Sequence, residues 1–271
     1  MTELEQRATQ MRKDIVAMIA KAGSGHPGGS LSSVEIMMAL YFGGVMNHDP
    51  ANPDDPNRDR FILAKGHAAP VLYTTLAHAG YFAREELMTL RQLGSRLQGH
   101  PDSNLLPGVE VSTGSLGQGL SVAAGAASGL KLDQSEATVF TLLGDGECEE
   151  GQVWEAAMYA AHYGLDNLVA IVDRNGLQID GKTEDVMDPS NLREKFKAFR
   201  WDVHEVDGHD VAALIDVLNK AKAAHTGKPQ VVIARTVKGK GVSFMENQAG
   251  WHGKAPNDEQ TKAALEELDA Q

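Results

Sequence analysis

The sequence of 271 residues contains very little cysteine and an excess of acidic over basic residues. A single cysteine excludes a disulfide within the chain and suits a reducing compartment. Lys and Arg number 25 against 37 Asp and Glu, which gives a formal net charge of −12. This charge argues against nonspecific binding to nucleic acids or anionic membranes. We therefore expect neither as a partner.

Long apolar runs are also absent from the start of the chain. The first apolar run, residues 15–20, is too short to cross a bilayer and lies within a charged helical pattern. We find no internal repeat, no low-complexity tract and no convincing linker. We therefore expect residues 1–271 to form one domain of a cytoplasmic protein.

Apolar, β-branched segments alternate with helical patterns along the chain. Strands are expected over residues 60–63, 137–143, 168–172, 202–206 and 230–236. Helices are expected over residues 3–22, 32–42, 71–80, 84–93, 120–130, 153–163, 211–224 and 259–268. Residues 23–30 are too rich in glycine for a helix interior, and loops are expected over 47–60, 176–201 and 239–256. This order predicts an α/β fold with a doubly wound, mostly parallel sheet flanked by helices.

Two of the predicted strands end in residues that suit a metal–diphosphate site. Strand 137–143 is followed by Gly144-Asp145-Gly146 and then a helix, and strand 168–172 is followed by a segment containing Asn175. If these strands are parallel neighbours, Asp145 and Asn175 meet at the carboxyl edge of the sheet, where open α/β sheets bind ligands. Carboxylate and amide oxygens suit Mg²⁺, and glycine permits close approach of a diphosphate. A Gly-Asp-Gly sequence alone is usually an ordinary turn, so the strand context carries the inference.

With Asn175 downstream, the Gly-Asp-Gly motif resembles the thiamine diphosphate motif, and segments 150–156 and 175–181 resemble those of transketolases. The resemblance covers nearly the whole chain and implies the diphosphate-type domain of the thiamine diphosphate-binding fold. It implies that Asp145, the side chain of Asn175 and the carbonyl of Leu177 bind Mg²⁺, or another divalent cation such as Ca²⁺ or Mn²⁺. Implied cofactor-binding residues are His67, Gly114, Ser115, Leu116, Gly144, Gly146 and Glu150, and many relatives have proline in place of Ser115.

Four of the ten histidines lie in glycine-flanked loops that resemble transketolase motifs. A loop histidine can reach a polar ligand and transfer protons near neutral pH, although a single one is more often a turn residue in water. The resemblance implies catalytic roles for His26, His100 and His252. His26 and His100 would contact the donor sugar, and His252 would assist proton transfer and diphosphate binding. His209 is equally glycine-flanked but has no implied role.

Several other polar residues near these motifs have structural interpretations. Glu147, Glu149 and Glu150 are interpreted as a solvated acidic helix start, which the helix dipole favours, and of the three only Glu150 also matches a family glutamate. Cys148 is interpreted as a free thiol and not as a nucleophile. The segment 238–241, with its two lysines, suggests phosphate contacts, but a mobile loop is the favoured interpretation.

The chain resembles only the diphosphate half of a transketolase. The pyrimidine-binding domain and its activating glutamate have no counterpart here. We therefore expect the N-terminal subunit of a two-chain transketolase that transfers a two-carbon ketol unit from a ketose phosphate to an aldose phosphate. Its expected partner is a C-terminal subunit in an α₂β₂ assembly. The alternatives are the α subunit of a 2-oxo acid dehydrogenase, against which the motifs at His26 and His100 argue, and a non-catalytic cofactor-binding subunit.

Overall fold

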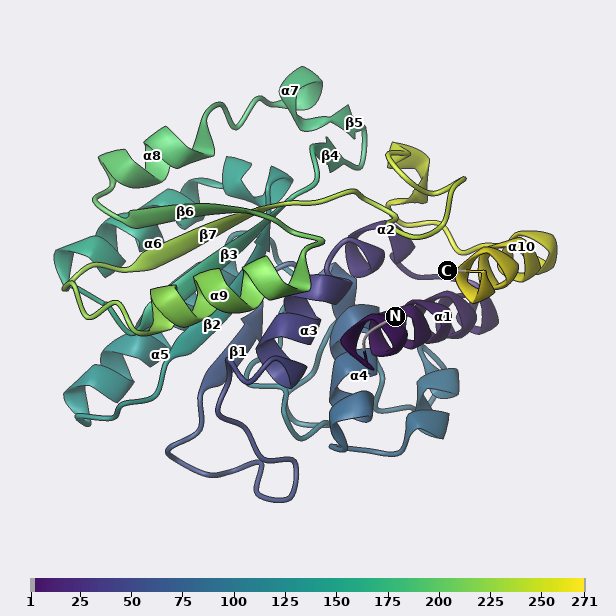
Figure 1. The fold of residues 1–271 in the computed structure, drawn as a ribbon, viewed down its shortest axis with the longest axis horizontal. Helices are drawn as coiled ribbons and strands as arrows, with labels where there is room; N and C mark the ends of the chain where they lie inside the picture. The colour runs from purple at the N-terminus through teal and green to yellow at the C-terminus, as the bar shows by residue number, and fades with distance from the viewer. Residues whose placement is uncertain (1–2, 271) are drawn as a thin grey trace.

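A computed structural model describes residues 3–270 and places a five-stranded sheet between two layers of helices (Figure 1). In spatial order the strands are β1 (Arg60–Leu63), β2 (Val139–Gly144), β3 (Leu168–Arg174), β7 (Gln230–Arg235) and β6 (Asp202–Asp207). Every neighbouring pair in this sheet is parallel. The predicted parallel α/β sheet is confirmed.

The strand side chains alternate between two apolar cores, because successive residues of a strand point to opposite faces. One core contains Phe61 and Phe140 and is covered by α1 (Glu3–Ala22), α3 (Val34–Phe42), α4 (Ala69–Ala79) and α9 (Val211–Lys222). The other contains Ile62 and Val139 and is covered by α5 (Gln118–Leu132), α6 (Gly151–His162) and α8 (Leu192–Ala198). Burial on both faces explains why these strands are almost continuously hydrophobic.

The first and last helices lie side by side at one end of the molecule (Figure 1). Helix α10 (Asp258–Asp269) packs against α1, and Asp269 forms an ion pair with Lys13. Its capping box joins Asn257 and Gln260, which satisfies backbone groups at the helix start. No helix within residues 3–270 is long and apolar enough to cross a membrane.

Two predictions about short segments were wrong. The glycine-rich segment contains a helix, α2 (Pro27–Leu31), that runs through Gly28. Tertiary packing requires the small residue there, because a Cβ on Gly28 would lie 3.0 Å from the Lys238 side chain and from a backbone carbonyl oxygen. The helix predicted over 84–93 is the 3₁₀ segment η2 (Arg84–Thr89). It does not continue, because Arg91 has a φ of +58°.

The predicted loop over 176–201 contains regular structure. It includes the antiparallel hairpin of β4 (Leu177–Gln178) and β5 (Gly181–Lys182), the short helix α7 (Thr183–Val186), and α8. In α8 the side chain of Asn191 caps the first turn, and Leu192 and Phe196 are buried. Two buried residues on one short helix give too weak a periodic pattern to predict it.

Candidate active site

A cavity of about 300 Å³ lies at the carboxyl edge of the sheet, where β1, β2 and β3 end. The structure brings most of the predicted site residues together around it. The predicted residues that line it are His26, His67, Gly114, Leu116, Gly144, Asp145, Gly146, Glu150, Asn175, Leu177 and His252. His100 and Ser115 are exposed and do not line it.

Asp145 lies in the turn between β2 and the 3₁₀ segment η3 (Gly146–Glu149). Its two carboxylate oxygens accept hydrogen bonds from the backbone amides of Gly146 at 3.0 Å and Gly176 at 2.6 Å. Burial and the charge of Asp173 raise the pKa of Asp145 to about 6. A carboxylate offers about four acceptor positions, so two hydrogen bonds leave capacity for a cation.

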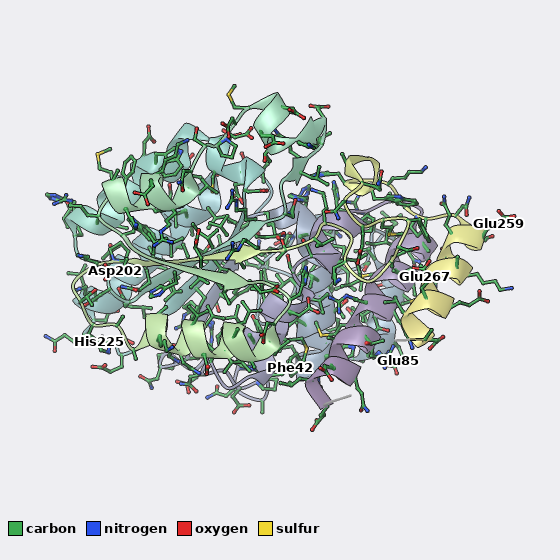
Figure 2. All side chains as sticks on the ribbon, turned by 45° about the horizontal axis from the view of Figure 1, so that its top comes forward. Phe42, Glu85, Asp202, His225, Glu259 and Glu267 are labelled. Carbon is green, nitrogen blue, oxygen red and sulfur yellow. The ribbon has the colours of Figure 1, made fainter. Side chains whose placement is uncertain are left out.

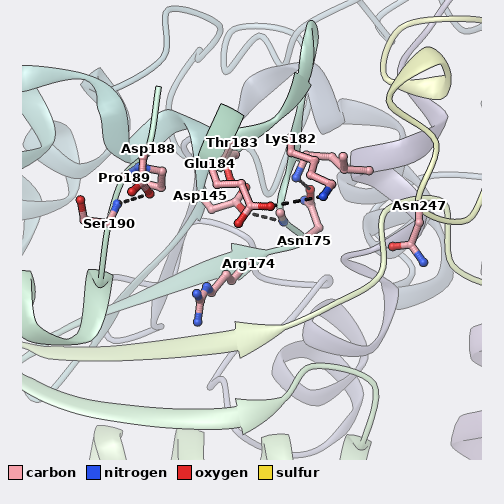
Figure 3. Close-up of a pocket in the computed structure, with 12 residues that line it drawn as sticks. Asp145, Arg174, Asn175, Lys182, Thr183, Glu184, Asp188, Pro189, Ser190 and Asn247 are labelled. Atoms are coloured by element: carbon pink, nitrogen blue, oxygen red, sulfur yellow. Dashed lines mark hydrogen bonds and ion pairs between the residues drawn. The ribbon is translucent and has the colours of Figure 1, made fainter. Parts of the chain in front are cut away.

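The orientation of the Asn175 amide is fixed by its neighbours. Its Nδ2 donates to Asp173 at 3.1 Å, and its Oδ1 accepts from the amide of Leu177 at 3.1 Å. Figure 3 shows Asp145 and Asn175 close together, and their strands are paired in parallel as predicted. The carbonyl of Leu177 already accepts a hydrogen bond from the ammonium of Lys238 at 2.9 Å. A positive charge is therefore accommodated at this carbonyl.

These observations fit a hard divalent cation. Asp145, Asn175 and Leu177 offer a carboxylate, an amide oxygen and a backbone carbonyl, and Mg²⁺ prefers a few such oxygens together with phosphate oxygens. Within the described part of the chain no group of three or more His, Cys, Asp or Glu residues is arranged to hold a metal ion. The predicted metal ligands, Asp145, Asn175 and Leu177, do not form such a group, because only Asp145 belongs to one of these four residue types.

A buried ion pair lies beneath this site. The ammonium of Lys65, which follows β1, contacts Asp173 in β3 and also donates to the carbonyl of Gly29 and the hydroxyl of Ser33. Lys65 is 2% exposed and Asp173 0%. Burial raises the pKa of Asp173, but the charge and hydrogen bond of Lys65 outweigh it, and the pKa lies below its usual value. Since Asp173 orients Asn175, this pair sets the geometry of the predicted metal site.

Three histidines of the cavity lining lie close to one another. The ring centroids of His26 and His67 are 5.3 Å apart, those of His67 and His252 are 5.0 Å apart, and those of His26 and His252 are 5.6 Å apart. Burial, with nearby positive charges, lowers the pKa of His26 to about 4, that of His252 to about 3, and that of His67 well below its usual value. All three are therefore neutral near pH 7.

One buried nitrogen of this histidine group lacks a hydrogen-bond partner among the described residues. Nδ1 of His252 is buried and forms no hydrogen bond among the described residues. An unpaired buried polar atom is costly, and a polar ligand in the cavity would satisfy it. This orphaned atom fits the predicted binding of a diphosphate.

His100 lies at the rim of the cavity and not inside it. Its ring packs over Gly114, where an added Cβ would lie 3.2 Å from the imidazole. A larger residue in place of Gly114 would therefore require a small shift of the His100 ring. Partial burial and the charge of Arg91 lower the pKa of His100.

Lys238 was wrongly interpreted as part of a mobile loop. It is 2% exposed and lines the cavity. Burial is the main reason that its pKa falls to about 8.

Lys65 and Asp173 were also not identified from the sequence as residues of the site. Each is a charged residue at the end of a buried strand, and this feature could have indicated them.

Glu147 was wrongly interpreted as solvated. It is 3% exposed, and its two oxygens accept from the amides of Gly117 and Gly144, each at 3.0 Å. Burial raises the pKa of Glu147 to about 7.

Cys148 is fully buried, and burial raises the pKa of its thiol well above the usual value. This environment suits a free thiol and not a nucleophile.

Residues 5–270 match the family model described as transketolase, thiamine diphosphate binding domain. The chain belongs to the transketolase family. It is 44% identical to the 6-deoxy-6-sulfo-D-fructose transketolase subunit SqwG of a Clostridium species, over 98% of this chain and 96% of that subunit. It is 45% identical to an apulose-4-phosphate transketolase subunit of Actinobacillus succinogenes, over 98% of this chain and 96% of that subunit.

Solved transketolases have the same fold. The crystal structure of Campylobacter jejuni transketolase matches 98% of this chain with a TM-score of 0.91 at 34% identity. The chain spans 42% of that protein, whereas it spans nearly all of the two curated transketolase subunits. The predictions of an N-terminal transketolase subunit, of a ketol-transferase enzyme and of a thiamine diphosphate-binding fold are confirmed.

Proposed function

We propose that this chain, as one domain, holds a divalent cation and the diphosphate end of thiamine diphosphate within a two-chain transketolase. The observation that carries the proposal is the cleft itself. Three predicted oxygen ligands, the ammonium of Lys238 and three neutral histidines surround one cavity at the carboxyl edge of a parallel sheet. Such an edge is where open α/β folds bind phosphorylated ligands.

In this proposal Asp145, Asn175 and Leu177 bind Mg²⁺, or Ca²⁺ or Mn²⁺. Gly144 and Gly146 permit close approach of the diphosphate. His67 and Lys238 donate hydrogen bonds to its oxygens, and Nδ1 of His252 gains its missing partner. The remaining cofactor contacts come from Gly114, Ser115, Leu116 and Glu150. Bound thiamine diphosphate supplies the nucleophilic carbon that carries the ketol unit.

The substrate side of the cleft consists of histidines. A neutral imidazole donates one hydrogen bond and accepts another, which suits the adjacent oxygens of a ketose. His26, in the cavity lining, and His100, at the rim, would bind the donor sugar near its carbonyl, and His252 would exchange a proton with the substrate oxygen. We propose a ketose phosphate as donor and an aldose phosphate as acceptor. The two curated subunits carry different ketoses in their names, so the family resemblance does not select one sugar.

The proposed partner is a C-terminal transketolase subunit that carries the pyrimidine-binding domain. Apolar side chains are exposed beside the cleft, where Ile179 is 67% exposed and Leu116 is 36% exposed. Further exposed apolar residues lie on the hydrogen-bonded helices α5 and α6 or directly after α6: Val122, Met158, Tyr159 and Tyr163. Exposed apolar surface of this kind marks interaction sites. We propose an α₂β₂ heterotetramer in the cytoplasm with the cofactor between the two kinds of chain.

The test is ketol transfer by the purified chain, alone and with the transketolase-like chain encoded beside it, in Mg²⁺ and thiamine diphosphate. We expect activity only with both chains, and we expect Asp145→Ala to abolish it. Asp216→Ala is the matched control, since Asp216 is exposed on α9. Full activity of the chain alone would contradict the proposed architecture. A fully active Asp145→Ala complex would favour a non-catalytic subunit, and pyruvate decarboxylation without ketol transfer would favour a 2-oxo acid dehydrogenase.

A further inference from the structure

His209, which lies outside the cofactor cleft, binds the backbone next to Lys238. Its Nε2 is 2.8 Å from the amide nitrogen of Val237, and its Nδ1 is 2.9 Å from a carboxylate oxygen of Glu35. An amide N–H can only donate, so Nε2 is the acceptor and carries no proton. Nδ1 then carries the proton and donates to Glu35. The two contacts fix both the tautomer and the orientation of the ring.

Glu35 binds a second side chain that reaches the same segment. Arg12 donates through Nη2 to the other oxygen of Glu35 at 2.5 Å and through Nε to the carbonyl of Lys240 at 3.1 Å. Glu35 is 7% exposed. Burial raises its pKa, but Arg12 and His209 outweigh this effect, so its pKa lies below the usual value and the group is ionised. One buried carboxylate therefore orients two side chains that hold residues 237 and 240.

Lys238 lies between these two anchor points. Its backbone carbonyl accepts from the amide of Asn247 at 2.9 Å, and the next amide, of Gly239, donates to the carbonyl of Gly28 at 3.0 Å. Its ammonium reaches across to the carbonyl of Leu177. The segment is therefore fixed on both sides of the lysine, and the side chain extends from it into the cleft.

Arg12, Glu35 and His209 do not line the cofactor cavity. They line a different cavity of about 940 Å³, together with residues of α1 and α9. The hydrogen bonds to the amide of Val237 and the carbonyl of Lys240 connect them directly to the backbone that carries Lys238. Close packing supports this connection, because a Cβ on Gly208 would lie 2.4 Å from the side chain of Thr236. The turn that carries His209 is thus packed directly against the end of β7.

We propose that Arg12, Glu35 and His209 are positioning residues that hold the ammonium of Lys238 at the diphosphate end of the cleft. The inference rests on the proposed function, which makes Lys238 a diphosphate ligand. Lysine has a long, flexible side chain, so its ammonium can be held at one place in the cleft only if its backbone is rigid. Loss of the anchor at Val237 would let the lysine sample other positions and would weaken binding without removing any ligand contact directly.

Two substitutions of His209 separate its two hydrogen bonds. In His209→Gln the Oε1 atom replaces Nε2 and still accepts from Val237. In His209→Asn the Nδ2 atom replaces Nδ1, so the donor to Glu35 is kept and the acceptor for Val237 is lost. His225→Asn is the matched control, because His225 is exposed on the surface (Figure 2).

The first measurement is the affinity of the full chain for inorganic pyrophosphate with Mg²⁺, by calorimetry, and for thiamine diphosphate when the partner chain is present. We expect His209→Asn to weaken both about fivefold to tenfold, the equivalent of one lost hydrogen bond. We expect His209→Gln to retain most of the affinity and His225→Asn to retain all of it. In a Lys238→Met background, His209→Asn should cause no further loss, because it acts through the lysine.

The second measurement is hydrogen exchange of the amide of Val237 in the free chain. We expect faster exchange in His209→Asn than in His209→Gln or the parent chain. Unchanged exchange, unchanged affinity, or equal loss with and without Lys238 would each overturn the inference. If the parent chain and its complex bind neither pyrophosphate nor thiamine diphosphate, the proposed function is wrong. The positioning of residues 237–240 would then be judged by the exchange rate alone.

Discussion

Two glycines of helix α5 should respond in opposite directions to the same substitution. Gly119 lies in the first turn of the helix, and a Cβ there would lie 2.4 Å from the Cβ and 2.5 Å from the Cα of Ala64, at the end of β1. Gly125 lies in the middle of the same helix, is exposed, and would place a Cβ with no atom within 4 Å. Gly119→Ala and Gly125→Ala therefore share the helix and the added methyl group but differ in packing.

The magnitudes follow from these contacts. Alanine is preferred over glycine inside a helix by about 0.5–1 kcal/mol, so Gly125→Ala should raise the free energy of unfolding by about that amount. Ordinary carbon–carbon contacts are about 3.5–4.0 Å, so Gly119→Ala forces α5 and the end of β1 apart by about 1 Å. Overpacking of a core costs about 1–3 kcal/mol, which exceeds the helix preference. Gly119→Ala should therefore destabilise the chain.

The assay is urea unfolding of the isolated chain, followed by tryptophan fluorescence and circular dichroism. The midpoint should rise for Gly125→Ala and fall for Gly119→Ala, with the slope of the transition unchanged. Ala64 precedes Lys65, so Gly119→Ala should also weaken pyrophosphate binding. A Gly119→Ala chain as stable as the parent, or a Gly125→Ala chain less stable by more than about 1 kcal/mol, would refute this account of the packing.

Three further predictions concern charged groups. Lys65→Met leaves Asp173 buried without its counterion and should cost about 3–5 kcal/mol in urea unfolding, and Asp173→Asn in the same chain should recover part of the loss. The ring carbon signals of His26 should not titrate between about pH 5.5 and 8 in NMR spectra of the free chain, because its pKa is lowered to about 4. Burial raises the pKa of Asp14, but hydrogen bonds from His78 and a neighbouring guanidinium lower it below 3.8 overall. The stability that Asp14 contributes is therefore complete above about pH 4 and lost as the pH falls further, and Asp14→Asn should flatten this part of the stability–pH curve.

Local sequence patterns were sufficient for the main strands and helices. The predicted helix over 3–22 is α1, and the predicted strand over 60–63 is β1. Helix α1 has an apolar pattern with the period of a helix, and β1 has the short, continuous apolar run of a strand that is buried on both faces. The wrong predictions concern segments in which the apolar pattern is weak or in which tertiary packing overrides the local preference. In α2, glycine is disfavoured by propensity but required by the approach of Lys238, and in α8 the apolar face is too short to be recognised.

The sequence by itself determined the residues of the predicted site: the Gly-Asp-Gly turn after one strand, Asn175 after the next, and the histidines in glycine-rich loops. These are local features, because a strand end and a turn are encoded by neighbouring residues. Only the tertiary structure decided that Lys238 is buried in the cleft, that Asp173 and Lys65 form the pair beneath it, and that His209 holds the backbone beside it. Charged residues far apart in a sequence have no periodic pattern, and their partners and burial are set only when the parallel strands and the flanking helices bring them together.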